Sequence, residues 1–313
     1  MNKLALRKEQ LFKELEEDHQ LFVFVHSAAE KVLWSMVDEV SPSLYVNLLP
    51  EEDEDKLFEV APFIVSVKMN DELSDWILSN EKLMKDAFFI TTTLPLDQFA
   101  ARFRNIIYCQ NHEGRLFYFG FYTADIFSTY LSYLREHEPS QCKGLLFGIE
   151  TIYFHKFLFY QSRQEELPEE TLYYPLKAKE YVKGLNVDKA EPSSYLPPRF
   201  FDYFSQSRTF KYKEKLRTVM LEKYPDSSYS QQNRDITFKM MSAMIKSAGS
   251  YGITDEVAVA FLIEANWVAN HDVINEEIAQ EFLTTKLSQR DRASLFLEKI
   301  QHFNLNVRVG NNV

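Results

Sequence analysis

Residue types and motifs that carry chemistry are scarce in this chain of 313 residues. It has only 8 glycines, and neither a Gly-x-Gly-x-x-Gly pattern nor another phosphate-cradling loop occurs. Nucleotide binding by the familiar routes is therefore not expected. The two cysteines, Cys109 and Cys142, give no disulfide framework, and no cysteine pair has the spacing of metal ligands. The sequence predicts no cofactor, no metal site and two plain thiols.

Short patterns that resemble catalytic motifs lack their partners. Residues 79–82 have the Ser-x-x-Lys spacing of penicillin-recognising enzymes, but the Ser-Asp-Asn and Lys-Thr-Gly motifs of those enzymes are missing. His112-Glu113, His137-Glu138 and His271-Asp272 juxtapose possible ligands, yet adjacent residues do not converge on one metal ion. We interpret these segments as solvated helix ends and surface turns, and we predict that the protein is not an enzyme.

Basic residues are also fewer than acidic ones. The chain has 35 basic and 46 acidic residues, a net charge of −11. Because nucleic-acid binding depends on neutralising phosphates with Lys and Arg, this balance argues against a general nucleic-acid partner. No apolar run approaches the roughly 20 residues of a membrane span, and the first residues lack the apolar core of a signal peptide. We therefore expect a cytoplasmic protein without membrane insertion.

The N-terminal half shows a repeated alternation of strands and helices. The short apolar runs 63–67 and 88–93 are typical of buried strands, as is Leu21–Val25. After Pro95, apolar residues recur with the period of one helix face: Leu96, Phe99, Ala100, Phe103, Ile106 and Ile107. Ser27 and Glu30 have the spacing of a capping box that would open a further helix. We predict an N-terminal α/β lobe with a mixed sheet.

Prolines and a change of composition mark the lobe boundaries. Residues 163–206 hold a cluster of glutamates and then Pro175, Pro192 and Pro197-Pro198, so an extended, aromatic-rich connector is expected there. We place the α/β lobe at 1–162, an all-helical lobe at 207–304 and a frayed tail at 305–313, an α+β fold as a whole. The apolar stripe from Met240 to Ile245 can be either core or a binding groove, and the sequence does not distinguish these.

An ordered series of segments resembles a known family. The order LFVFVHSA, SLYVNLL, LFEVAPFIVSV, DELSDWIL, FFITTT, FAARFRNI and GRLFYFGFYTADIFSTYL is similar to the effector adaptor/chaperone family of type VI secretion systems, the TEC or Tap proteins. The shared features include Ala61-Pro62-Phe63, Trp76 and Phe103-Arg104, over roughly residues 20–160. Where many members have Tyr-Asp-Pro-Arg, this chain has Tyr122-Thr123-Ala124-Asp125.

The resemblance implies a non-catalytic function. Proteins of this family bind a toxic effector and help to place it on the VgrG spike of the secretion machine. We therefore expect two protein partners, a type VI effector and VgrG. Two other interpretations stay open: a hydrolase whose carboxylate and histidine site has no recognisable spacing, and an acidic immunity protein that neutralises a toxin. The identity of the effector, the stoichiometry and the lobe that meets each partner are not encoded in any recognisable pattern.

Four residues are candidates for the partner-binding surface. Arg102 and Arg104 fall off the apolar face of their predicted helix, and Tyr118 and Tyr122 lie on the aromatic strand predicted to follow. Arg and Tyr are enriched at interface hot spots because each combines packing area with hydrogen bonding. The alternative is that the arginines pair locally with acidic residues and the tyrosines pack inside the lobe.

Overall fold

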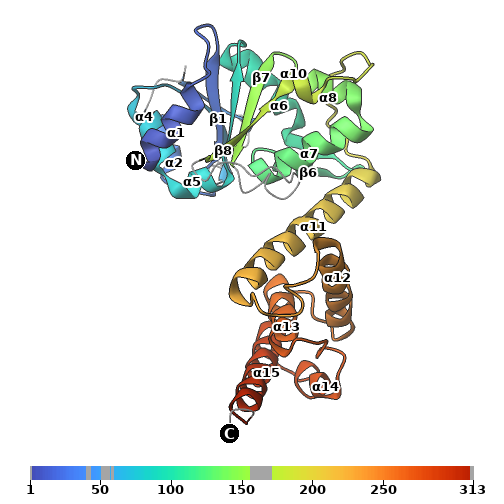
Figure 1. Cartoon of the computed structure of the whole chain (residues 1–313). Helices are drawn as coiled ribbons and strands as arrows, with labels where there is room; N and C mark the ends of the chain where they lie inside the picture. Colours follow the sequence, from blue (N-terminus) through green and yellow to red (C-terminus); the bar gives the residue numbers. More distant parts are fainter. Residues whose placement is uncertain (1, 40–43, 51–56, 58–59, 156–170, 311–313) are drawn as a thin grey trace. The chain divides into compact units, whose positions relative to one another are not determined.

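The computed structural model describes residues 2–39, 44–50, 57, 60–155 and 171–310, with side chains up to 303. The chain divides into two compact units, residues 1–207 and 208–313. The first unit combines a sheet with helices and the second is helical, so the predicted α+β class is confirmed (Figure 1). No helix in these described ranges has the length and apolarity needed to cross a membrane.

The first unit is built on a six-stranded sheet. In order across the sheet, its strands are β2 (Tyr45–Asn47), β3 (Pro62–Val67), β1 (Gln20–His26), β4 (Phe88–Thr92), β7 (Ile149–His155) and β8 (Tyr173–Lys177). Every pairing within it is antiparallel, so the predicted mixed sheet is wrong. The strand and helix alternation suggested crossovers between paired parallel strands. Instead β1 is inserted between β3 and β4, which run parallel without touching.

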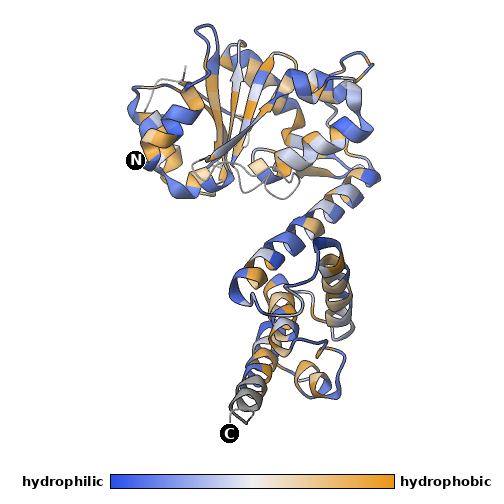
Figure 2. Ribbon diagram, in the orientation of Figure 1, coloured by the Kyte–Doolittle hydropathy of each residue, from blue (hydrophilic) through white to orange (hydrophobic). Residues whose placement is uncertain are grey.

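Helices cover both faces of this sheet, because strand side chains alternate between faces. Phe22 and Phe24 point into a core with α6 (Leu96–Ile107), α7 (Ala124–His137) and α8 (Pro139–Leu145). Val23 and Val25 point into a second core with α1 (Lys3–Phe12), α2 (Leu33–Asp38), α4 (Glu72–Ser79) and α5 (Glu81–Asp86). Figure 1 shows the two sets of helices on opposite sides of the sheet, and Figure 2 shows hydrophobic residues concentrated in its strands.

The local sequence pattern predicted helix α6 correctly, but it did not predict the start of α2. The residues of α6 that are buried are the six that its apolar period predicted. By contrast, α2 starts at Leu33 without a side-chain cap, and residues 27–29 form a turn, so the predicted capping box is wrong. The Ser27 hydroxyl is buried and has no hydrogen-bond partner in the described part of the chain.

The aromatic segment after α6 is not a long strand. It forms a small hairpin of β5 (Tyr108–Gln110) and β6 (Leu116–Tyr118), separate from the main sheet. Gly114 takes a φ of +77° in its turn, a backbone conformation that favours glycine. Tyr122 lies in the turn before α7 rather than on a strand, which corrects its predicted placement.

The region predicted as a connector belongs largely to the first unit. β8 is its edge strand, α10 (Ala178–Tyr181) follows, and α11 (Pro198–Lys223) begins before the division at residue 207. Pro175 is tolerated because an edge strand can lose one backbone donor without breaking a ladder on both sides. The first unit thus extends past the predicted end of the α/β lobe at 162 to residue 207, where the helical lobe was predicted to begin. Residues 163–170 of the predicted connector lie outside the described residues.

The second unit packs α12 (Arg234–Ser250), α13 (Glu256–Ala269), α14 (Glu277–Leu283) and α15 (Gln289–Gly310) with the later part of α11. Met241 and Met244 are buried in its core, and Met240 and Ile245 pack against it. The methionine stripe is thus core. α15 continues as a helix to Gly310, beyond the predicted start of a frayed tail at 305, while 311–313 lie outside the described residues.

Candidate partner-binding site at the edge of the sheet

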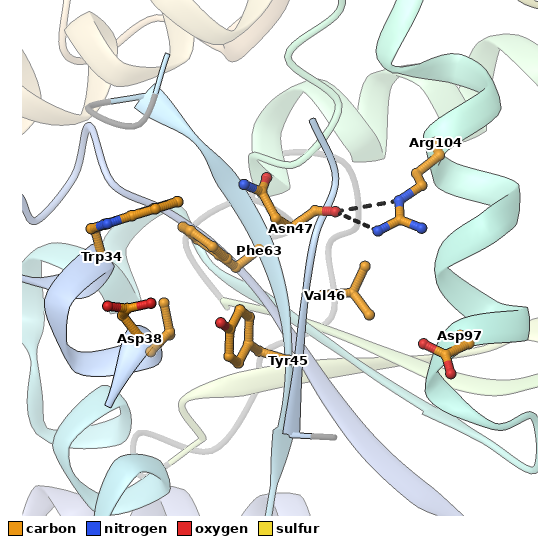
Figure 3. Close-up of a pocket in the computed structure, with 9 residues that line it drawn as sticks. Trp34, Asp38, Tyr45, Val46, Asn47, Phe63, Asp97 and Arg104 are labelled. Carbon is orange, nitrogen blue, oxygen red and sulfur yellow. Dashed lines mark hydrogen bonds between the residues drawn. The ribbon is translucent and has the colours of Figure 1, made fainter. Parts of the chain in front are cut away.

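A cavity of about 320 Å³ lies at the outer edge of β2, the terminal strand of the sheet as described. Helix α2 borders it on one face of the sheet and α6 on the other. Figure 3 shows its lining residues on both sides of β2. They are Trp34, Val37, Asp38, Tyr45, Val46, Asn47, Phe63, Asp97 and Arg104. The cavity therefore spans the sheet edge instead of opening on one face only.

One side of the cavity is an aromatic wall. The rings of Trp34 and Phe63 have centroids 5.7 Å apart, and those of Tyr45 and Phe63 are 6.1 Å apart. Phe63 is fully buried on β3, and its ring contacts those of Trp34 and Tyr45. Asp38, at the end of α2, lies beside this wall (Figure 3).

Asn47 and Arg104 join β2 to the other side of the cavity. The amide of Leu48 donates to the Pro62 carbonyl at 3.0 Å, so the alternation along β2 turns the Asn47 carbonyl away from β3. Arg104 donates to that carbonyl oxygen from Nη2 at 2.9 Å and from Nε at 3.3 Å. The guanidinium thus covers an outward-facing acceptor of the terminal strand.

The Asn47 side chain is buried, with an exposed fraction of 7%, but only one of its two polar atoms has a hydrogen-bond partner. Its Oδ1 accepts a hydrogen bond from the Leu49 amide at 3.0 Å. Its Nδ2 has no acceptor among the described residues. Buried polar groups in native proteins are nearly always hydrogen-bonded, and this donor, which is closed off from solvent, is an exception.

Two exposed carboxylates flank β2. Asp38 comes from α2 and Asp97 from the first turn of α6 (Figure 3). Among the residues that the structure describes, neither carboxylate takes part in an ion pair. The cavity therefore combines an aromatic wall, two exposed carboxylates and one guanidinium that is already engaged.

The structure separates the four predicted surface residues into three places. Arg104 lines the cavity. Arg102 lies two residues earlier on α6, which turns its side chain away from Arg104. Its guanidinium donates to the Phe147 carbonyl and lies 5.5 Å from the centre of the Phe147 ring, and burial lowers the pKa of Arg102.

Tyr118 and Tyr122 form the third place, together with His26. The Tyr118 and Tyr122 rings are 5.7 Å apart, and the Tyr122 and His26 rings are 5.2 Å apart. Burial raises the pKa of both phenols and lowers the pKa of His26. Both tyrosines are half-buried and pack against the core that contains Phe22 and Phe24.

Trp34, Asp38, Asn47 and Asp97 were not predicted as site residues. One signal was present: Asp97 and Arg104 are seven residues apart, which puts both on one side of a helix. No periodicity shows that α2 and β2 meet this side, because that contact depends on the strand order of the sheet.

A group of possible metal ligands occurs elsewhere. Glu16, Asp18 and His19 bring ligand atoms within 4.8 Å of one another, but both carboxylates are exposed. His19 Nδ1 lies 3.0 Å from Asp18 and 3.6 Å from Glu16. Such distances suit an ordinary surface ion pair of a histidine, and no further feature marks the group as a metal site.

Comparison with known proteins gives one family match. Residues 11–141 match the family described as Domain of unknown function (DUF4123). This stretch contains β1 to β4 and every residue that lines the cavity. No curated protein and no solved structure matches the chain.

Proposed function

We propose that the protein is a non-catalytic adaptor that binds a cognate type VI secretion effector and promotes its loading onto the VgrG spike. The observation that carries the proposal is the DUF4123 match, because that family is associated with type VI effector adaptors. The match includes every residue that lines the cavity at the β2 edge, so the region with family character also holds a candidate contact surface.

The chemistry of the cavity supports binding to a protein. Its polar groups come from two helices and a strand edge, and they comprise carboxylates, a guanidinium and amide groups around aromatic rings. Aromatic rings and arginine are enriched at the centres of protein interfaces. On this proposal the protein acts in the cytoplasm, before the effector leaves the cell.

Co-purification tests the proposal directly. The tagged protein is expressed together with the products of the genes that flank its own, including any VgrG and any toxin. We expect a complex that survives gel filtration, and a lower yield of soluble toxin when the protein is omitted. Equal toxin yield and equal secretion in a deletion strain would refute the adaptor function. Protection of susceptible cells by this protein alone would instead support an immunity protein.

A further inference from the structure

The hairpin strand β6 has an unpaired outer edge. The amide of Gln110 on β5 donates to the Ser194 carbonyl at 2.7 Å, and the Gln110 carbonyl accepts from the Leu196 amide at 3.0 Å. Gln110 is in register with Leu116, so these two residues do not bond to each other and the backbone N–H and C=O of Leu116 point outward. Neither group has a hydrogen-bond partner among the described residues. Figure 1 shows β6 apart from the main sheet.

The two terminal strands of the main sheet differ from β6. Arg104 covers an outward carbonyl of β2, and β8 carries Pro175, which cannot donate a backbone hydrogen bond. Charged side chains and proline commonly protect sheet edges in this way. Leu116 instead has an exposed fraction of 74%, the largest of any large hydrophobic side chain in the described residues. The adjacent Arg115 pairs with Glu113 at 3.2 Å.

Apolar side chains lie on both faces of this edge. Leu116 and Tyr118 point to one face of the hairpin, because strand side chains alternate. On the other face, the Phe117 ring lies 5.7 Å from the ring of Phe201, which is 39% exposed. Side chains of a strand added to β6 would alternate in the same way, and on either face they would meet an apolar neighbour. The edge therefore suits a run of consecutive apolar residues.

The length of β6 favours a segment of another protein over a second copy of this chain. β6 has three residues. Two copies joined only through these residues would bury far less than the roughly 1,200 Å² of a stable interface. A segment of a partner that is also held elsewhere does not need such an area, because its second contact is effectively intramolecular.

We infer that the outer edge of β6 receives an extended segment of a partner protein, which carries consecutive apolar residues and continues the small sheet as an added strand. In strand addition, main-chain hydrogen bonds give affinity and the flanking side chains give specificity. The inference rests on the proposed adaptor function, and it adds the place and the chemistry of one contact.

A synthetic peptide tests the backbone contact. The probe is fluorescein-labelled Ser-Gln-Val-Ile-Val-Gln-Ser, measured by fluorescence polarisation, and each of its variants carries one N-methyl group at a different residue. N-methylation removes a backbone donor, and only every second donor of an added strand faces its neighbour. We expect saturable binding that is lost at alternate positions. Loss at every position, or at none, would overturn the inference.

Substitutions at Leu116 separate the backbone from the side chain. Leu116→Ala removes the exposed side chain. Leu116→Pro also removes the outward N–H, while the hydrogen bonds between β5 and β6 stay in place because that N–H does not belong to them. Leu116→Pro should bind the peptide at least about fivefold more weakly than Leu116→Ala, the usual effect of one hydrogen bond. Equal binding by two folded variants would overturn the inference, and circular dichroism melts verify folding.

Two phenylalanines of α11 supply a matched control for general attraction of an apolar peptide. Phe201 and Phe210 are both 39% exposed. Phe210 belongs to the second unit, where its ring lies 5.2 Å from that of Phe238. Phe201→Ser should weaken binding of the peptide and Phe210→Ser should not. Equal weakening by both would overturn the inference.

Hydrogen exchange of the unchanged protein locates the peptide without any substitution. Added protection is expected at the outward amides of Leu116 and Tyr118, and protection confined to other segments would overturn the inference. Light scattering tests the other occupant. Self-association of the unchanged protein that Leu116→Pro abolishes would assign the edge to a second copy of the chain and overturn the inference as well.

The adaptor function is tested separately from this edge. A toxin complex that persists unchanged in Leu116→Pro refutes only the role of β6. Peptide binding that follows the expected pattern, without any toxin complex, refutes only the adaptor function.

Discussion

Arg104 donates two hydrogen bonds, at 2.9 and 3.3 Å, to the backbone carbonyl oxygen of Asn47 on the terminal strand of the sheet. An uncovered strand edge is a template for unwanted pairing with other chains, and proteins commonly protect such edges with charged side chains. The guanidinium covers one outward acceptor of β2 while leaving Asp38 and Asp97 accessible. The edge is thus guarded at this outward acceptor.

Arg104→Ala should expose this acceptor. We expect the free energy of unfolding to fall by about 1 kcal/mol, the usual contribution of a hydrogen bond, and self-association to increase. Urea denaturation and light scattering across a concentration series measure the two effects. Arg115→Ala is the control, because Arg115 is exposed and pairs with Glu113 only two residues away. A variant as stable and as monomeric as this control would show that Arg104 does not protect the edge.

Tyr122→Ala should destabilise the fold and leave the cavity intact. The Tyr122 ring packs against His26 and Tyr118 and lies 6.3 Å from Phe121. Removing a half-buried aromatic ring should cost about 2 kcal/mol, roughly half of the loss for a fully buried one. Tyr122→Phe keeps the ring and should cost much less. If thermal melts show no difference between the two variants, Tyr122 is a surface group, as its candidate role in partner binding required.

The sequence predicted what depends on local periodicity and missed what depends on strand order. The buried face of α6 followed from its spacing, since Phe99 and Phe103 lie one turn apart. The position of β1 between β3 and β4 has no local signal, and it decides that the sheet is antiparallel. The cavity was missed for the same reason. Arg104 was recognised by its residue type, but its partner Asn47 is 57 residues away and meets it only through the order of strands.

The stability of the protein should depend on pH through His26. Burial lowers the pKa of His26 below its usual value of 6.5, although the charge of Asp86 partly opposes this. Neither ring nitrogen has a partner among the described residues. Because the unfolded chain then binds the proton more tightly, stability should fall as the pH drops through 6.5 towards the folded pKa.

Urea denaturation at pH 8 and at pH 5.5 measures this loss. His26→Phe keeps an aromatic ring next to Tyr122 but cannot take up a proton, so its stability should change less between the two pH values. His112→Gln, at an exposed turn, serves as the control and should lose as much as the unchanged protein. An equal pH response in His26→Phe would assign the effect to other groups.

A fragment of residues 1–162 should not fold cooperatively, whereas a fragment of residues 1–207 should. The shorter fragment lacks β8 and Phe200, whose ring lies 5.1 Å from Tyr133 and 5.6 Å from Phe119 in the main core. Loss of Phe200 would leave core aromatic rings exposed, and loss of β8 would leave the edge of β7 unpaired. Both changes favour aggregation. Thermal melts and gel filtration of both fragments test this. A monomeric, cooperative 1–162 fragment would show that β8 and the first turn of α11 are dispensable, and that the predicted boundary at 162 is a true domain boundary.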